Sequence, residues 1–248
     1  MRKILLVTGG GRGIGAATAR LAASRGYAVV LTYRSDRAAA DGVVADIAAA
    51  GGDALALRAD AGVEADMLKV FARLDAWDGR LAALVNNAAV LERQMRFDQM
   101  DVERWQRILN TNVIGAFVSC REAVRRMSTR YGGSGGAIVN VSSVAAELGS
   151  PGEYVDYAAS KGAIDTLTVG LAREVAGEGI RVNAVRPGII YTDIHASGGD
   201  PGRVDRLKTG VPMGRGGQAD EVARSILWLL SDEASYVTGA CLNVSGGR

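Results

Sequence analysis

Near its start the chain reads Ile4-Leu5-Leu6-Val7-Thr8-Gly9-Gly10-Gly11-Arg12-Gly13-Ile14-Gly15-Ala16. Four consecutive apolar residues are typical of a strand buried on both faces, and the glycines that follow indicate a tight turn into a helix. Such a turn lets the backbone approach a pyrophosphate, and the helix N-terminus offers unpaired N–H groups to the anion. Gly11 to Ala16 satisfies the dinucleotide-binding pattern G-x-G-x-x-A. The stretch therefore predicts a nucleotide-cofactor site, although glycine turns also arise for purely structural reasons.

Beyond this turn, short apolar runs alternate with segments of helical period up to the last residues. The strand candidates are 4–7, 28–32, 54–57, 82–85, 137–141, 181–185 and 241–244. The helix candidates are 16–25, 37–50, 64–77, 101–131, 157–178 and 220–231. Strand–helix alternation of this kind builds a parallel sheet with helices on both faces. We expect an α/β fold with a doubly wound sheet of about seven strands, in a single domain over residues 1–248.

The alternation of strand and helix patterns stops between Pro187 and Pro212. This stretch holds glycines and the only histidine, His195. Long irregular segments in compact domains are usually binding loops or lids. Because ligands of open α/β sheets sit outside the carboxyl ends of the strands, we expect a substrate loop at about 188–212. His195 either contacts substrate there or lies on the surface of a mobile segment, and the second interpretation is the simpler one.

Bulk composition argues against several classes of protein. The 29 Lys+Arg against 27 Asp+Glu give no concentrated basic patch of the kind that nucleic-acid binders carry. No apolar run approaches the roughly 18 residues of a membrane span. The opening Met1-Arg2-Lys3 is similar to a signal peptide, but the apolar run after it is too short. Cys120 and Cys241 lack metal-ligand spacing, so we expect no metal and two buried, reduced thiols in a cytoplasmic protein.

A second group of polar residues lies in the second half of the chain. Tyr157 and Lys161 are four residues apart, so on a helix they share one face. A tyrosine is a poor base at neutral pH, but an adjacent cation lowers its pKa, and Tyr157 could then exchange a proton with a carbonyl oxygen or an alcohol. The spacing alone occurs often by chance. Val141-Ser142-Ser143 adds a hydroxyl at the end of a strand, fourteen residues before Tyr157.

Two further polar stretches are ambiguous by themselves. Asn86-Asn87-Ala88 ends a strand, and Asn110-Thr111-Asn112 lies inside the long helical segment 101–131. Such amides act either as capping groups or as buried groups that bend a helix.

Taken together, these motifs resemble the short-chain dehydrogenase/reductase superfamily, and the resemblance covers essentially the whole chain. Thr8, Gly9, Gly13 and Gly15 match its Thr-Gly-x-x-x-Gly-x-Gly pattern. The other matches are Asn86-Asn87-Ala88 to its Asn-Asn-Ala-Gly element, Ser143 to its serine, Tyr157 with Lys161 to its Tyr-x-x-x-Lys signature, Asn112 to its tetrad asparagine, and Pro187-Gly188 with Thr192 to its nicotinamide-carboxamide segment. The sequence looks most like bacterial glucose-1-dehydrogenase-like and 3-oxoacyl-carrier-protein-reductase-like members.

The resemblance implies a Rossmann-type fold and a catalytic set of four residues. Tyr157 would be the general acid/base, and Lys161 would lower its pKa and hold the nicotinamide ribose. Ser143 would hydrogen-bond the substrate oxygen, and Asn112 would position a water in the proton relay. Ser143 lies one residue further from Tyr157 than is common in the family, which leaves Ser142 as a rival. Ala89 also replaces the usual glycine of Asn-Asn-Ala-Gly.

The glycine turn and the resemblance together give a cofactor-binding set. It comprises Thr8, Gly9, Gly11, Arg12, Gly13, Ile14, Gly15, Tyr33, Arg34, Ser35, Asp60, Ala61, Asn87, Ala88, Ala89, Tyr157, Lys161, Pro187, Gly188, Ile190 and Thr192. In NAD sites an acidic residue about 20 positions beyond the turn binds the ribose 2′-hydroxyl. Here that position is the neutral Tyr33, followed by Arg34, so we expect NADP in preference to NAD. Alternatively, Asp36 serves an NAD ribose, or Ser35 accepts either cofactor.

The function expected is an NAD(P)-dependent oxidoreductase that transfers a hydride between the nicotinamide and a small-molecule carbonyl or secondary alcohol. The rival hypothesis is a cofactor-binding regulator or scaffold that has lost its chemistry, but such proteins typically lose the tyrosine or lysine. The resemblance also implies a homotetramer or homodimer, paired through 101–131 and 157–178. The small residues Ala163, Thr166 and Gly170 would allow close packing there.

Overall fold

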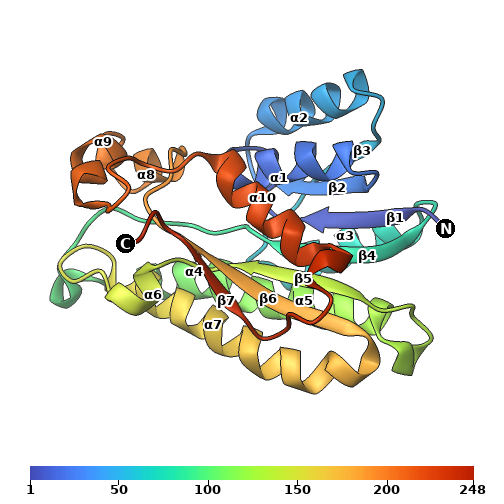
Figure 1. Ribbon diagram of the computed structural model, residues 1–248. Coiled ribbons are helices and arrows are strands. Elements are labelled where there is room, and N and C mark those ends of the chain that lie inside the picture. Colours follow the sequence, from blue (N-terminus) through green and yellow to red (C-terminus); the bar gives the residue numbers. More distant parts are fainter.

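The computed structural model describes all residues 1–248. Its centre is one sheet of seven parallel strands in the order β3-β2-β1-β4-β5-β6-β7 (Figure 1). The strands are β1 Lys3–Val7, β2 Ala28–Tyr33, β3 Ala54–Arg58, β4 Arg80–Asn86, β5 Gly136–Val141, β6 Ile180–Pro187 and β7 Cys241–Val244. The strand order reverses between β1 and β4, which is where ligands bind in doubly wound sheets. The predicted Rossmann-type fold is confirmed.

Helices cover both faces of the sheet (Figure 1). On one face lie α1 Gly13–Ser24, α2 Arg37–Ala49 and α10 Ala219–Leu230. On the other lie α3 Glu64–Asp75, α4 Val102–Leu109, α5 Gly115–Met127 and α7 Val155–Val175. Adjacent strand residues point to opposite faces: Leu5 and Val7 pack under the first group of helices, Ile4 and Leu6 under the second. This two-sided burial explains why the strands read as continuous apolar runs.

The segment 101–131, expected as one helix, is helical without a break from residue 102 to residue 127, but it contains a π-helical turn and ends earlier than expected. α4 passes into a π-helical turn at Asn110–Ile114, then into α5, which ends at Met127. A 3-10 turn, Thr129–Tyr131, follows. π-Helical turns inside α-helices are frequent at functional sites, and this one carries Asn112.

Two other boundaries differ from the sequence-based expectation. α1 begins at Gly13 rather than at residue 16, so Gly13 to Gly15 form its first turn. The segment 188–212, expected as a substrate loop, is also partly regular. It contains the short helices α8 Ile194–Ser197 and α9 Arg203–Leu207 and the 3-10 turn Lys208–Gly210, too short to show a period in the sequence. Short helical turns also lie at Ala145–Leu148 (α6), Phe97–Gln99, Ala176–Glu178 and Asp232–Ala234.

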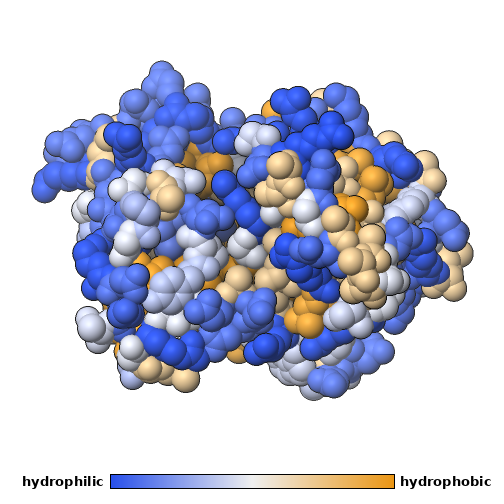
Figure 2. All heavy atoms as spheres, turned by 90° about the horizontal axis from the view of Figure 1, so that it is seen from above, coloured by the Kyte–Doolittle hydropathy of each residue, from blue (hydrophilic) through white to orange (hydrophobic).

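The face of the molecule seen in Figure 2 is mainly hydrophilic. Seen from above Figure 1, apolar residues form only small groups between polar ones (Figure 2). None of the helices is both long and apolar enough to cross a membrane. Both cysteines are free thiols: Cys120 is buried as expected, but Cys241 is only half-buried.

Candidate active site

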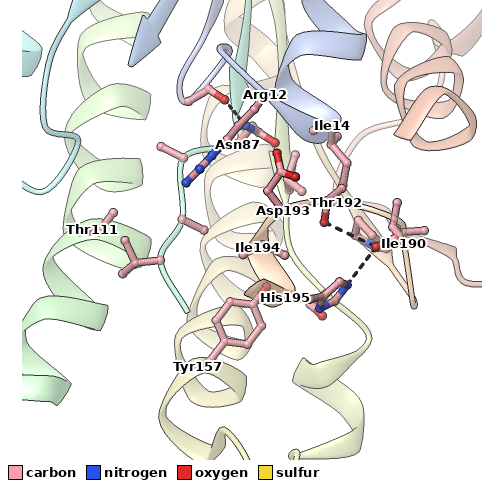
Figure 3. A pocket seen from close by; sticks show the side chains of 18 of the residues that line it. Arg12, Ile14, Asn87, Thr111, Tyr157, Ile190, Thr192, Asp193, Ile194 and His195 are labelled. Carbon is pink, nitrogen blue, oxygen red and sulfur yellow. Dashed lines mark hydrogen bonds between the residues drawn. The ribbon is translucent and has the colours of Figure 1, made fainter. Parts of the chain in front are cut away.

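A cleft of about 300 Å³ opens at the carboxyl edge of the sheet, where the strand order reverses. It is lined by the glycine turn, by the ends of β2, β4, β5 and β6, by the start of α7 and by the segment that carries α8. Figure 3 shows Tyr157 and His195 at one end of this cleft and Arg12 and Asn87 towards the other. All of the predicted site residues line it except Thr8, Gly15 and Asn112.

The glycine turn has the shape that a phosphate group requires. Gly9 and Gly13 have φ angles of 64° and 53°, in the left-handed region that favours glycine. The Arg12 side chain does not cap α1, so the first N–H groups of the helix have no side-chain partner. Any side chain at Gly15 would place its Cβ 2.4 Å from the Gly9 carbonyl oxygen. The turn therefore fits an anion close to backbone.

Thr8, Gly15 and Asn87 hold the turn in place from behind. Thr8 Oγ1 accepts hydrogen bonds from the N–H groups of Asn87 and Ala88, both at 3.0 Å. The Asn87 amide donates to the Thr8 and Gly9 carbonyl oxygens at 3.0 and 2.9 Å. Thr8 and Gly15 are buried beneath the cleft surface, where they support the turn.

Two arginines that line the cleft have unpaired guanidinium groups. The guanidinium groups of Arg12 and Arg34 are exposed, line the cleft and have no hydrogen-bond or ion-pair partner within the chain. Arg58 donates from Nε to the Arg34 carbonyl oxygen at 3.3 Å. Asp36 also lines the cleft, and its Oδ1 accepts the Ala39 N–H at 3.0 Å as the N-cap of α2.

Tyr157, Lys161 and Ser143 meet at the other end of the cleft. Lys161 Nζ lies 5.5 Å from the centre of the Tyr157 ring and donates to the Val141 carbonyl oxygen at 2.7 Å. The Ser142 hydroxyl is buried and donates to the Lys161 carbonyl oxygen at 3.2 Å. Ser143 is half-buried, and its hydroxyl accepts only the Ala145 N–H at 3.1 Å. Of the two serines, Ser143 has the more available hydroxyl.

Burial dominates the protonation of this cluster. It raises the pKa of Tyr157 to about 12, while the neighbouring Ser143 hydroxyl acts in the opposite direction. Burial likewise lowers the pKa of Lys161 to about 8, against the opposing effect of the Asp165 carboxylate. In the cofactor-free chain the desolvation of Tyr157 acts against the lowering of its pKa that is expected from Lys161, and that lowering stays a prediction.

Asn112 is tied to its protein neighbours. Its Oδ1 accepts the Val90 N–H at 2.8 Å, and its Nδ2 donates to the Val90 carbonyl oxygen and to Ser160 Oγ, both at 3.1 Å. The side chain is buried behind the cleft wall. Its amide therefore fastens the segment after β4 to α7.

Sequence reasoning missed residues of 188–212 at the end of the cleft that holds Tyr157. His195, interpreted as a surface residue, is half-buried and lines the cleft: its Nε2 donates to the Ile190 carbonyl oxygen at 2.9 Å, whereas the buried Nδ1 has no partner (Figure 3). Burial also lowers the pKa of His195. Arg203 of α9 forms two hydrogen bonds to the Glu153 carboxylate and lies over the Tyr154 ring at 5.2 Å. No sequence signal links residues this far apart.

The chain is similar to proteins of one family along its whole length. The profile of the family described as Enoyl-(Acyl carrier protein) reductase matches residues 9–248. "Uncharacterized oxidoreductase YgfF" of Escherichia coli (strain K12) is 60% identical over 245 residues, with 99% of both chains covered. "3-oxoacyl-[acyl-carrier-protein] reductase" of Synechocystis sp. (strain ATCC 27184 / PCC 6803 / Kazusa) is 39% identical, over 99% of this chain and 96% of its own length.

A solved structure shows the same fold. The short chain dehydrogenase from Burkholderia cenocepacia J2315 in complex with NADP superposes with a TM-score of 0.90 at 34% identity, covering 99% of this chain and 97% of its own. The chain therefore belongs to the short-chain dehydrogenase/reductase family. It is an NAD(P)-dependent oxidoreductase acting on CH–OH or C=O groups of a small molecule. Its glycine turn and unpaired arginines fit such a cofactor.

Proposed function

We propose that the enzyme exchanges a hydride and a proton with a carbonyl or secondary alcohol substrate, with Tyr157 as the general acid/base. The observation that carries the proposal is the meeting of Tyr157, Lys161 and Ser143 in the cleft that the glycine turn opens into. The bound nicotinamide supplies or accepts the hydride. The rival hypothesis, a regulator without chemistry, has no supporting feature, since every group that proton transfer requires is present.

The protein groups divide the proton chemistry among them. A Tyr157 pKa of about 12 keeps the phenol protonated at neutral pH, so it can donate a proton to a carbonyl oxygen. In the reverse direction a phenolate is needed, and the Lys161 cation beside the ring favours that form. Ser143 hydrogen-bonds the substrate oxygen, and Asn112 acts by holding Val90 and α7 in register.

Tyr157→Phe tests this assignment. The change removes the proton donor but leaves the phosphate-binding turn untouched. We expect turnover to fall at least about a hundredfold, because a positioned acid contributes roughly 10²–10⁴ in rate. The NADPH dissociation constant, followed by fluorescence titration, should stay within about twofold. Turnover is measured as NADPH oxidation against a panel of ketones, aldehydes, sugars and 3-oxoacyl thioesters, which also identifies the substrate class. A folded variant with normal turnover would contradict the proposal.

NADP(H) is the proposed cofactor in preference to NAD(H). The support is the pair of free guanidinium groups at Arg12 and Arg34, which line the cleft. Charge-assisted hydrogen bonds to a 2′-phosphate are strong, but both arginines are exposed and therefore screened by solvent. Arg34→Ala should weaken NADPH binding about tenfold and leave NADH binding unchanged. Arg37→Ala, on the outside of α2 and paired with Asp41, is the matched control. Tighter binding of NADH than NADPH to wild type would overturn the assignment.

We further propose a single domain over residues 1–248, with the segment 188–212 as its substrate side, and a homotetramer or homodimer. The cytoplasmic location stays a prediction, supported by two unpaired thiols.

A further inference from the structure

A buried ion pair links α4 to α7 outside the cleft. Arg104 Nε donates to Asp156 Oδ2 at 2.6 Å, and Nη2 donates to Asp156 Oδ1 at 3.3 Å. Both side chains are only 4% exposed. Removing two charges from water costs several kcal/mol per ion, and apolar residues of similar volume often stabilise a fold equally well. Stability alone is therefore a weak reason for this pair.

The Asp156 carboxylate of this ion pair also binds the backbone of Tyr157, the proposed proton donor. Asp156 directly precedes Tyr157, and its Oδ1 also accepts the Tyr157 N–H at 2.8 Å. This N–H lies in the first turn of α7, where backbone donors have no partner within the helix. Arg104 thus fixes the carboxylate, and the carboxylate fixes the start of the helix at Tyr157.

The Arg104 guanidinium also binds the backbone of the segment that forms one wall of the cleft. Arg104 Nη1 donates to the Arg93 carbonyl oxygen at 2.7 Å. Arg93 belongs to the segment 87–95 after β4, whose first four residues line the cleft. The rest of this segment packs on the substrate side: a Cβ added at Gly198 would lie 3.0 Å from Leu91, and one at Gly199 would lie 3.4 Å from Arg93.

We propose that Arg104 is a positioning residue for the reaction. Through Asp156 it fixes Tyr157, and through the Arg93 carbonyl it fixes the segment 87–95, so that the proton donor and the substrate wall keep a constant separation. A planar guanidinium with five donors can serve a carboxylate and a carbonyl at once, whereas a lysine ammonium cannot reproduce that fork. The inference rests on the proposed role of Tyr157.

Three variants separate positioning from stability. Arg104→Met leaves a buried carboxylate unpaired and should lower both stability and kcat. Arg104→Met combined with Asp156→Asn removes both charges, and the amide oxygen of the new asparagine can still accept the Tyr157 N–H. The unfolding midpoint of this double variant should therefore recover relative to Arg104→Met alone. Arg104→Lys keeps the charge beside Asp156 but loses the hydrogen bond to the Arg93 carbonyl oxygen. The control is Arg107→Met, on the same helix, which breaks an exposed pair with Glu92 of the same segment.

Kinetics are measured with NADPH and the panel compound that wild type reduces fastest. We expect about tenfold lower kcat and severalfold higher KM in the double variant despite its recovered stability, because small misplacements of reacting groups are costly. Arg104→Lys should raise KM with kcat nearly unchanged, and Arg107→Met should resemble wild type. NADPH dissociation constants should stay within about twofold throughout.

Two outcomes would overturn the inference. One is a double variant whose kcat and KM return to wild type together with its stability, and the other is a folded Arg104→Lys enzyme with unchanged KM. Tyr157→Phe, assayed in parallel, keeps the two proposals apart: full activity there removes the role of Tyr157 itself, whereas an inactive Tyr157→Phe beside normal Arg104 variants rejects only the positioning role.

Discussion

Burial works against the charge that the proposed mechanism needs on Lys161. The side chain is 3% exposed, and its pKa falls to about 8 because the charged form is poorly solvated. The unfolded chain, with a pKa near 10.5, then binds more protons at this lysine than the folded one between pH 8 and 10.5. The contribution of Lys161 to the free energy of unfolding therefore rises with pH across that window.

The variant Lys161→Met makes the free-energy cost of burying the charged Lys161 measurable. From pH 7.5 to 9.5 the cofactor-free wild type should gain about 2 kcal/mol of stability relative to the variant, since a shift of one pKa unit corresponds to about 1.4 kcal/mol. Urea unfolding of both proteins at the two pH values gives this difference, in which the other titrating groups cancel. The raised pKa of Tyr157 acts mainly above this range. Parallel stability curves would show that Lys161 is better solvated than its burial implies.

Among the elements, the glycine turn depends on a close approach of backbone to backbone. A Cβ at Gly15 would lie 2.4 Å from the Gly9 oxygen and 2.5 Å from Asn87 Nδ2, and the Asn87 amide is already bound twice. Gly15→Ala should therefore displace the turn and weaken NADPH binding at least about tenfold. Gly42→Ala, inside α2 with no atom within 4 Å of the new methyl, should leave binding unchanged and stabilise the helix by up to about 1 kcal/mol. Equal NADPH affinities in a fluorescence titration would contradict this account.

Elements with a local signal were predictable, and those set by distant contacts were not. The seven strands and the glycine turn follow from apolar runs and from the glycines between them. The π-helical turn at Asn110–Ile114 was not predicted, because apolar residues continue on both sides of it. The hydrogen bonds of its Asn112 amide are made to Val90 and Ser160, which lie far away in the sequence. The placement of His195 and Arg203 in the cleft depends on how residues 188–212 fold back on the sheet.

At the scale of the whole molecule, one surface is more apolar than an isolated chain requires. Four large side chains on α4, the π-helical turn and α5 are exposed: Val102 by 53%, Leu109 by 43%, Ile114 by 48% and Phe117 by 43%. α7 packs beside these helices and adds the exposed, small Thr166 and Gly170. Exposed apolar surface of this kind marks protein–protein contacts, and it coincides with the helices predicted to pair.

Phe117→Asp tests that surface. In a symmetric dimer the same patch meets itself, so each substitution enters the interface twice and buries two unpaired carboxylates. We expect wild type to be a dimer or tetramer at micromolar concentration, and the dimer of the variant to dissociate at least about a hundredfold more readily. Leu68→Asp, on α3 and exposed by 40%, should leave assembly unchanged. Light scattering reads out all three proteins. A monomeric wild type would remove the assembly proposal, whereas a Phe117→Asp protein as large as wild type would move the interface to another face.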